Sequence, residues 1–257
     1  MKRLIAIVLS IFASSQSWAA ITRVQKAIAD SCATTISANV AGNLLVVFCE
    51  GETAHATGVT DNASGGSNTY TRVDGSGGGL NGSVGPTTIW YSQTARSGAT
   101  TVTCASSPGC YGSGVREYAG ALASGDPVDA SSGTVSIGCT GGSSCNGATI
   151  TTTDAGAVIV AVAIPGSSIT GVASPYDVDF LGGTSNGQAF ADYIPGTTVT
   201  DSIAVWSDSN PSDAVGSSVA AFKAAATAAA TTGSVTTIPG SGSITTLPGT
   251  GSITTRP

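Results

Sequence analysis

Charged side chains are scarce in this chain, and aromatic residues and histidine are scarcer. Only 9% of the 257 residues are charged, with nine Lys and Arg against fifteen Asp and Glu, and there is a single histidine. A net charge of −6 with so few basic residues offers no basic face for phosphate groups. The composition therefore argues against nucleic acid and anionic membrane surfaces as partners. It also differs from that of helical proteins, which are rich in Ala, Leu, Glu, Lys and Arg.

Glycine, serine and threonine dominate instead, and glycine alone accounts for 35 residues. Such a composition favours short strands joined by glycine-rich turns. All-β domains of about 200 residues commonly fold as one unit. We therefore expect an all-β protein with one domain over residues 20–223 and a separate tail over residues 224–257.

The first residues have the pattern of an export signal. Lys2 and Arg3 precede an apolar run over residues 4–13 and a small-x-small site at Ser17-Trp18-Ala19. A bilayer core needs about 20 apolar residues, so the run is too short to span it, and we expect a signal peptide over residues 1–19. No later stretch is long and apolar enough to serve as an anchor. The expected location is extracellular or at the cell surface, with the periplasm as the other compartment.

Six cysteines suit an oxidising destination. Two pairs enclose five-residue loops of turn-forming residues, and facing residues of a hairpin lie within disulfide reach. The remaining two cysteines would then pair with each other, although six cysteines allow many other connectivities. Zinc is disfavoured because there is no Cys-x-x-Cys motif and only one histidine. The predicted disulfides are Cys104–Cys110, Cys139–Cys145 and Cys32–Cys49.

Several short runs rich in β-branched residues predict strands. Residues 43–48 and 157–164 are continuously apolar and predict buried central strands. Further strands are predicted over residues 88–91, 100–103, 115–118, 203–206 and 219–222.

Three segments recur in the same order in the second half of the chain. Residues 42–48 resemble 156–162, residues 97–103 resemble 195–200, and residues 115–118 resemble 219–222. A unit of roughly four strands that occurs twice would give a single β-sandwich or jelly roll with an approximate internal two-fold. Chance similarity among Thr- and Val-rich strands is the alternative.

A series of core-forming segments carries a resemblance to a known group of domains. The segments are AGNLLVVF at 41–48, VTDN at 59–62 with NTYT at 68–71, IWY at 89–91 with GATTV at 98–102, and EYAG at 117–120. The series resembles β-sandwich domains of bacterial exported and surface proteins, most of which carry no assigned activity. The resemblance covers roughly residues 35–223. It implies a fold and transfers no site, and neither the cysteine pairs nor the tail belong to it.

Two catalytic motifs match in letters but lack their context. Residues 183–187 read Gly-x-Ser-x-Gly, yet no histidine follows Ser185 and the lone His55 lies far upstream. Residues 77–82 read Gly-x-Gly-x-x-Gly, but a glycine- and proline-containing stretch follows where a dinucleotide site needs a helix. We therefore expect no enzyme.

The carboxylates give three further candidate sites. Glu50 and Glu52 share one strand face, which suits either a glycosidase pair or, as we favour, a strand that emerges into water. Strand alternation places Glu117 on the face opposite Arg116, either paired locally at a rim or in a ligand groove. Two aspartates at 177 and 179 could contribute to a calcium site, but Ca²⁺ takes about 6–8 oxygen ligands, so a solvated strand end is favoured. No cofactor is expected.

Beyond Lys223 the composition changes to a nine-residue repeat. Residues 233–241 recur as 242–250 and, shortened, as 251–257. The Pro-Gly step in the first two copies breaks a long strand or helix, and so short a unit cannot bury a core alone. The tail is either an extended or Thr-glycosylated spacer, or a segment that becomes ordered against a sheet edge.

Two classes of function fit these observations. The first is a secreted, non-catalytic structural or surface-interaction protein whose tail attaches to a cell-surface or matrix component or to another copy. The second is an extracellular carbohydrate-binding module, with a glycoside hydrolase as a third reading. The candidate binding residues are Glu117, Tyr70, Tyr91, Tyr111 and Trp206.

Overall fold

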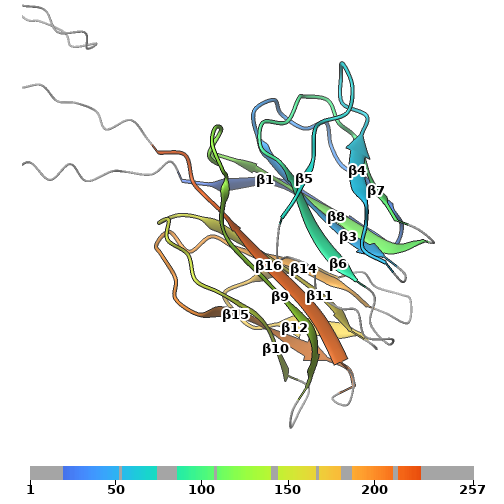
Figure 1. Ribbon diagram of the computed structural model, residues 1–257, viewed down its shortest axis with the longest axis vertical. Helices are drawn as coiled ribbons and strands as arrows, with labels where there is room; N and C mark the ends of the chain where they lie inside the picture. Colours follow the sequence, from blue (N-terminus) through green and yellow to red (C-terminus); the bar gives the residue numbers. More distant parts are fainter. Residues whose placement is uncertain are drawn as a thin grey trace, which may run out of the picture. The chain divides into compact units, whose positions relative to one another are not determined.

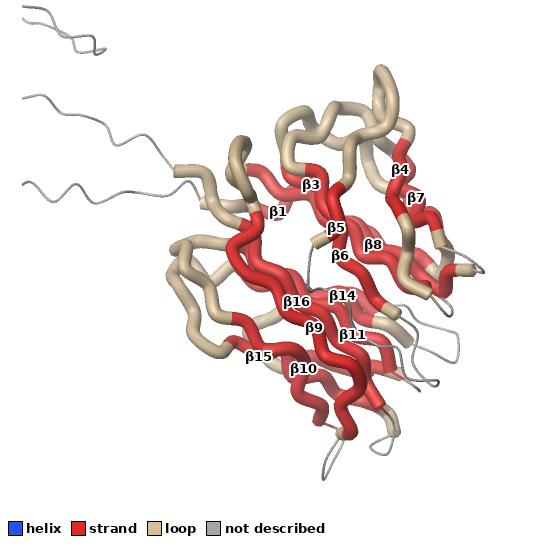
Figure 2. Tube along the Cα trace, in the orientation of Figure 1, coloured by secondary structure: helices blue, strands red, loops and turns tan. Residues whose placement is uncertain are grey.

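The computed structural model describes most of the chain between residues 20 and 226, within one compact unit over Trp18–Ala226. No residue in the described segments is helical, as Figure 2 shows, and none of them forms a helix that is long and apolar enough to cross a membrane. The predicted all-β class is confirmed. The signal segment and the repeat tail lie outside the described residues, which are 20–51, 54–73, 86–106, 109–139, 144–165, 168–180, 187–210 and 214–226.

Sixteen strands run through these segments, and every strand that the sequence predicted is among them. In chain order they are β1 (Thr22–Ala29), β2 (Ala33–Thr35), β3 (Leu44–Gly51), β4 (Gly58–Asp61), β5 (Thr71–Arg72), β6 (Thr87–Ser92), β7 (Thr101–Ala105), β8 (Cys110–Ala119), β9 (Val128–Gly138), β10 (Ser144–Ile150), β11 (Val158–Pro165), β12 (Ile169–Val172), β13 (Asp177–Phe180), β14 (Ala189–Tyr193), β15 (Ser202–Asp208) and β16 (Ala214–Phe222).

The described strands form four antiparallel sheets (Figure 1). Two have five strands, in the orders β1-β8-β3-β6-β5 and β13-β14-β11-β16-β9, and two have three, in the orders β2-β7-β4 and β10-β15-β12. The two sheets of each size have the same strand order once eight is added to each strand number. The order β1-β8-β3-β6-β5 becomes β9-β16-β11-β14-β13, which is the second five-stranded sheet read from its other edge, and β2-β7-β4 becomes β10-β15-β12. The strand order thus repeats after eight strands rather than the four that the sequence echo predicted. A single sandwich built from two four-strand halves is not confirmed.

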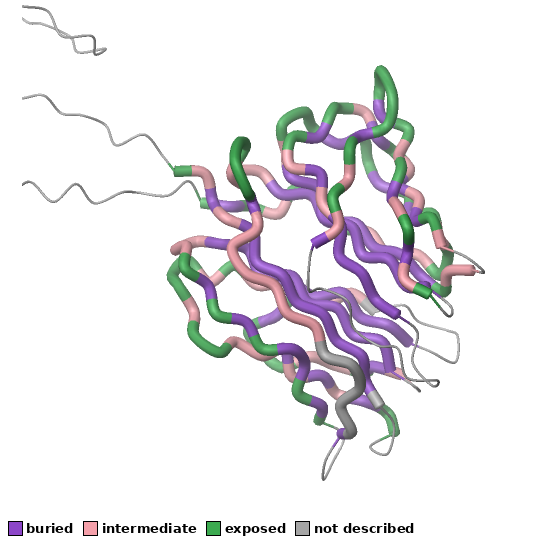
Figure 3. Tube along the Cα trace, in the orientation of Figure 1, coloured by how far each residue is buried: buried purple, intermediate pink, exposed green. Residues whose placement is uncertain are grey.

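Strands β3 and β11 are buried on both faces, which explains their continuous apolar sequences. Leu44, Val46 and Phe48 face an apolar cluster that β3 shares with β11 of the other five-stranded sheet. Leu45 and Val47 face a second cluster, against the sheet that contains β7. On β11, the alternate side chains likewise face a third cluster, which includes Trp206. The four sheets therefore pack as layers, with one apolar cluster between each neighbouring pair. Figure 3 shows β3 and β11 as continuously buried.

The two five-stranded sheets approach closely at Gly114 of β8. A Cβ atom added there would lie 2.8 Å from Cδ1 of Phe190 on β14. The ring of Phe190 also packs against Phe48, with 5.8 Å between the ring centroids. Glycine is needed here for space, because any side chain would displace an aromatic ring from a closely packed interior.

The disulfides differ in part from those predicted. Cys139 and Cys145 are bonded across the connection from β9 to β10, as expected. Cys104, however, is bonded to Cys49, with 5.8 Å between their Cα atoms, so the predicted Cys104–Cys110 and Cys32–Cys49 pairs are wrong. The physical reason is that β7 and β8 belong to different sheets and do not form a hairpin. The Cys49–Cys104 bond instead joins a five-stranded sheet to a three-stranded one.

A fully buried ion pair connects the two five-stranded sheets. Arg116 of β8 has no exposed surface, and its Nη1 donates to Oδ1 of Asp192 on β14 at 2.6 Å. The hydroxyl of Tyr118 donates to the other carboxylate oxygen of Asp192 at 3.0 Å. The Arg116 guanidinium also lies 4.7 Å from the ring centroid of Phe190 and donates to Oδ2 of Asp179 at 2.9 Å. A buried charge is tolerated only when such partners replace its hydration.

The two aspartates that suggested calcium are occupied by cationic side chains. Asp177 forms ion pairs with Arg23 and Lys26, and Asp179 forms an ion pair with Lys26 at 2.9 Å. Arg23 also donates to Asp192 at 2.6 Å. These contacts extend the buried pair outward to the surface, where Asp177 is half exposed. The positive charge that the carboxylates face is supplied by the chain itself.

Replacing Asp192 by Asn should lower the free energy of unfolding by about 3 kcal/mol, because it leaves the buried Arg116 charge without its main partner. The matched variant Asp177→Asn, which removes a half-exposed partner of the same cluster, should cost about 0–1 kcal/mol. Urea denaturation followed by tryptophan fluorescence measures both. Equal losses for the two variants would contradict a buried pair that bears on stability.

Candidate functional site

A polar groove lies beside β5 and β6 of the first five-stranded sheet. Its volume is about 530 Å³, within the range of about 300–1,000 Å³ that small-molecule sites occupy. Three segments line it: the chain that leads into β5, strand β6 with the turn after it, and the loop between β8 and β9. The lining residues are Asn68, Thr69 and Thr71; Tyr91, Ser92, Gln93, Thr94 and Arg96; and Gly125, Asp126 and Pro127.

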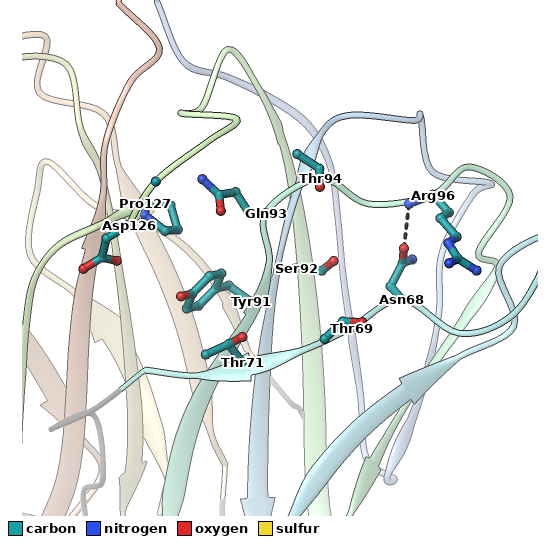
Figure 4. A pocket seen from close by; sticks show the side chains of 11 residues that line it. Asn68, Thr69, Thr71, Tyr91, Ser92, Gln93, Thr94, Arg96, Asp126 and Pro127 are labelled. Atoms are coloured by element: carbon teal, nitrogen blue, oxygen red, sulfur yellow. Dashed lines mark hydrogen bonds between the residues drawn. The ribbon is translucent and has the colours of Figure 1, made fainter.

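One end of the groove is held by a network around Asn68. Its side-chain oxygen accepts from the backbone N of Arg96 at 2.6 Å, the contact dashed in Figure 4. Its amide nitrogen donates to Oδ2 of Asp61 at 2.7 Å. The Arg96 guanidinium donates to the backbone oxygen of Gly65 at 2.7 Å. These bonds fix two loops against each other, so this end is shaped before any ligand binds.

Tyr91 lies at the other end, beside Thr71, its partner across the β5–β6 ladder (Figure 4). Its ring meets Phe222 edge-on at 5.5 Å between centroids, which anchors it to the core. Gln93 donates to the backbone oxygen of Leu122 at 2.9 Å and so ties the turn after β6 to the loop before β9. Asp126, in that loop, accepts from the backbone N of Val128 at 3.0 Å.

The groove combines one aromatic ring with hydroxyl, amide, guanidinium and carboxylate groups. Thr69, Thr71, Thr94, Arg96 and Asp126 are all exposed. A set of hydrogen-bonding groups around a ring face suits a polar, ring-shaped ligand such as a sugar. Among the described lining residues Asp126 is the single carboxylate, whereas a glycosidase uses two.

Of the candidate binding residues, only Tyr91 lines this groove. Trp206 is fully buried, and its Nε1 donates to Oγ of Ser217 at 3.3 Å, so it belongs to the core. Tyr70 donates its hydroxyl to Oδ2 of Asp61 at 2.7 Å and supports the loop behind the groove. Tyr111 is 43% exposed but lies on β8, away from the lining segments.

Glu117 is also outside the groove, although it is fully buried. Its Oε1 accepts from the backbone N of Val40 at 2.8 Å and from Nδ2 of Asn43 at 2.6 Å, and its Oε2 accepts from Nε2 of Gln25 at 2.5 Å. The carboxylate holds the segment before β3 against β8. Glu117 is thus paired within the chain, but in the interior and with partners distant in sequence, so neither the rim nor the ligand groove that the sequence offered describes its place.

The expectation that β3 emerges into water at Glu50 is wrong. It is fully buried near the end of β3, and its carboxyl oxygens have no hydrogen-bond partner among the described residues. Burial, with a smaller contribution from Asp30, raises the pKa of Glu50 to about 9. Its proposed companion Glu52 lies outside the described residues, as does Ser185 of the Gly-x-Ser-x-Gly match. Burial and Arg72 lower the pKa of His55, the lone histidine.

Most of the residues that line the groove were not predicted from the sequence. Asn68, Gln93 and Asp126 come from three separate loops, and no local pattern marks a loop residue as part of a shared concavity. Only the aromatic character of Tyr91 singled out a lining residue. A further cluster, of Cys139, Cys145 and Asp208, does not offer a metal site because its two sulfur atoms are bonded to each other.

No protein-family model, curated protein or solved structure matches this chain.

The two buried glutamates should respond in opposite ways to Gln substitution. Native Glu50 keeps its proton to about pH 9, whereas its ordinary value is 4.5. The native state therefore binds the extra proton in this window, and stability falls as pH rises through it, by up to about 1.4 kcal/mol per unit. Glu50→Gln should remove that dependence and raise the free energy of unfolding at pH 7 by on the order of 2 kcal/mol.

Glu117→Gln is the matched control, because it replaces a carboxylate that is surrounded by donors. An amide NH₂ would face a donor there, so the free energy of unfolding should fall by about 1–3 kcal/mol. Chemical denaturation from pH 5 to pH 9 separates the two effects. A Glu50→Gln protein that keeps the pH slope of the wild type would show that Glu50 is ionised in the native state.

Proposed function

We propose that this chain is an exported, non-catalytic structural or surface-interaction protein. The proposal rests on the bonding partners of three buried charged side chains. Arg116, Asp192 and Glu117 all bond to other parts of the same chain, across sheets or to the segment before β3. None of these three groups lines the groove, where catalysis would need them. The polar chemistry of the interior thus holds sheets together.

In this proposal the two sets of eight strands are duplicated sandwich units of jelly-roll type. The support is the strand order, which repeats with an offset of eight in both kinds of sheet. The echoing segments 42–48 and 156–162 fall on β3 and β11 or directly before them, eight strands apart. Export rests on the expected signal peptide, and two disulfides are compatible with it.

The repeat tail is the proposed attachment element. Within each of the first two copies, apolar residues stand three apart, as Val235 and Ile238 and then Ile244 and Leu247. A solvated linker needs no such pairs, because Gly and Ser alone provide reach. A strand added to a sheet edge does need them, to fill pockets along its length. This argument rests on sequence, since the tail lies outside the described residues.

Deleting residues 231–257 should leave the melting temperature of the strand-rich part nearly unchanged. The same deletion should abolish retention at the cell surface or self-association, measured by cell fractionation and by light scattering of purified protein. A truncated chain that is retained and assembles as the full-length chain does would reduce the tail to a spacer.

Carbohydrate binding is a second candidate function, favoured by the groove. Tyr91 lines the groove together with exposed threonine hydroxyls and the Asp126 carboxylate. One aromatic residue anchored to the core and ringed by polar groups is an arrangement suited to stacking on a sugar. The pre-formed loops around Asn68 lower the ordering cost of binding.

On a panel of neutral oligosaccharides, Tyr91→Leu should weaken binding about tenfold, because an aromatic contact is worth about 0.5–1.5 kcal/mol. Thr94→Trp, at an exposed position, should block the groove without disturbing the core. Tyr111→Leu is the matched control, a tyrosine outside the groove, and should bind as the wild type does. Isothermal titration measures the affinities, and equal binding by all four proteins would exclude the groove as the site.

A further inference from the structure

Two cysteines outside the observed disulfides lie near each other. Cys32 and Cys110 are both partly buried. The Cys110 thiol donates to the backbone oxygen of Gly112 at 3.6 Å, and burial together with the neighbouring Cys32 raises its pKa. The other four cysteines are bonded in the pairs described above. The six cysteines thus comprise two bonded pairs and two neighbouring cysteines that are not bonded.

The backbone around this pair runs alongside the Cys49–Cys104 bond. The backbone N of Cys104 donates to the backbone oxygen of Cys32 at 2.8 Å. On the other side, Cys110 faces Gly51 across the β3–β8 ladder, two residues beyond Cys49. Cys32 therefore neighbours Cys104, and Cys110 lies close to Cys49, the disulfide partner of Cys104. The two free cysteines lie on opposite sides of the same sheet-to-sheet boundary that the Cys49–Cys104 bond crosses.

Side-chain hydrogen bonds hold the backbone around Cys32 beside strand β8. Oγ of Ser113, on β8, donates to the backbone oxygen of Ser31 at 2.8 Å. The same hydroxyl lies 2.6 Å from Oγ1 of Thr34, in β2. Residues on both sides of Cys32 are thus fixed to β8 three residues from Cys110. The segment around Cys32 and the start of β8 are therefore held side by side, as a disulfide between them requires.

We propose that Cys32 and Cys110 form a third disulfide, which joins β8 to the segment that leads into β2. Each thiol gives up its proton, the two sulfur atoms form one bond, and the two electrons pass to a disulfide donor such as glutathione disulfide, which leaves as two thiols. The bond would lie beside Cys49–Cys104 as a second link between the same two sheets. All six cysteines would then be bonded, as the sequence predicted. Cys49 would be paired with Cys104 and Cys32 with Cys110, in place of the two pairs predicted for these four residues.

The test counts free thiols in the full-length protein. After refolding with glutathione disulfide, denaturation and labelling with a maleimide, mass spectrometry should find no labelled cysteine. Protein kept under mild reductant that spares the other two bonds should carry two labels, at residues 32 and 110. Two labels after refolding with glutathione disulfide would overturn the proposal.

Single variants assign the partner. Cys32→Ser should free one thiol, located at Cys110, and Cys110→Ser should free one at Cys32, so that either variant suffices if the other fails to fold. Cys139→Ser is the control and should free Cys145 alone. A label at Cys49 or Cys104 in the Cys32→Ser protein would show a different connectivity and refute the pair.

Discussion

Burial of β3 and β11 on both faces is the constraint on which the rest of this structure depends. Each strand lies between two apolar clusters, so no side chain along its central part can reach water. Fully burying a Val, Leu or Ile side chain is worth about 1.5–3 kcal/mol, and nine of the sixteen residues in the two strands are of these types. Any polar group on a neighbouring strand of the same layer must then find its partner inside the protein. Arg116 and Asp192 do so across the two sheets.

The same constraint explains where a ligand could bind. Polar groups are available where strands end and loops begin, and the groove around Tyr91 lies at such a place. A chain with 9% charged residues has few groups to place there. The described lining residues include one carboxylate, one guanidinium and several hydroxyls, which are groups that can form hydrogen bonds to a polar ligand.

The fold was more predictable from the sequence than the site. Continuous β-branched runs identified β3 and β11, and alternation correctly placed Arg116 and Glu117 on opposite faces of β8. Strand β9 was missed because its Ser- and Gly-rich sequence lacks an apolar alternation. The Cys104–Cys110 pairing failed because local spacing suggests a hairpin, whereas the chain crosses between sheets there. Glu50 was misplaced because its burial is a property of the assembled core and not of the local sequence.

The central claim is that the polar groups of this protein serve binding and packing rather than catalysis. Its most direct test is the release of reducing sugar from a panel of polysaccharides by the purified protein. The account predicts no release above that of a heat-denatured control. Release that persists through purification and is lost in an Asp126→Asn variant of unchanged melting temperature would contradict it.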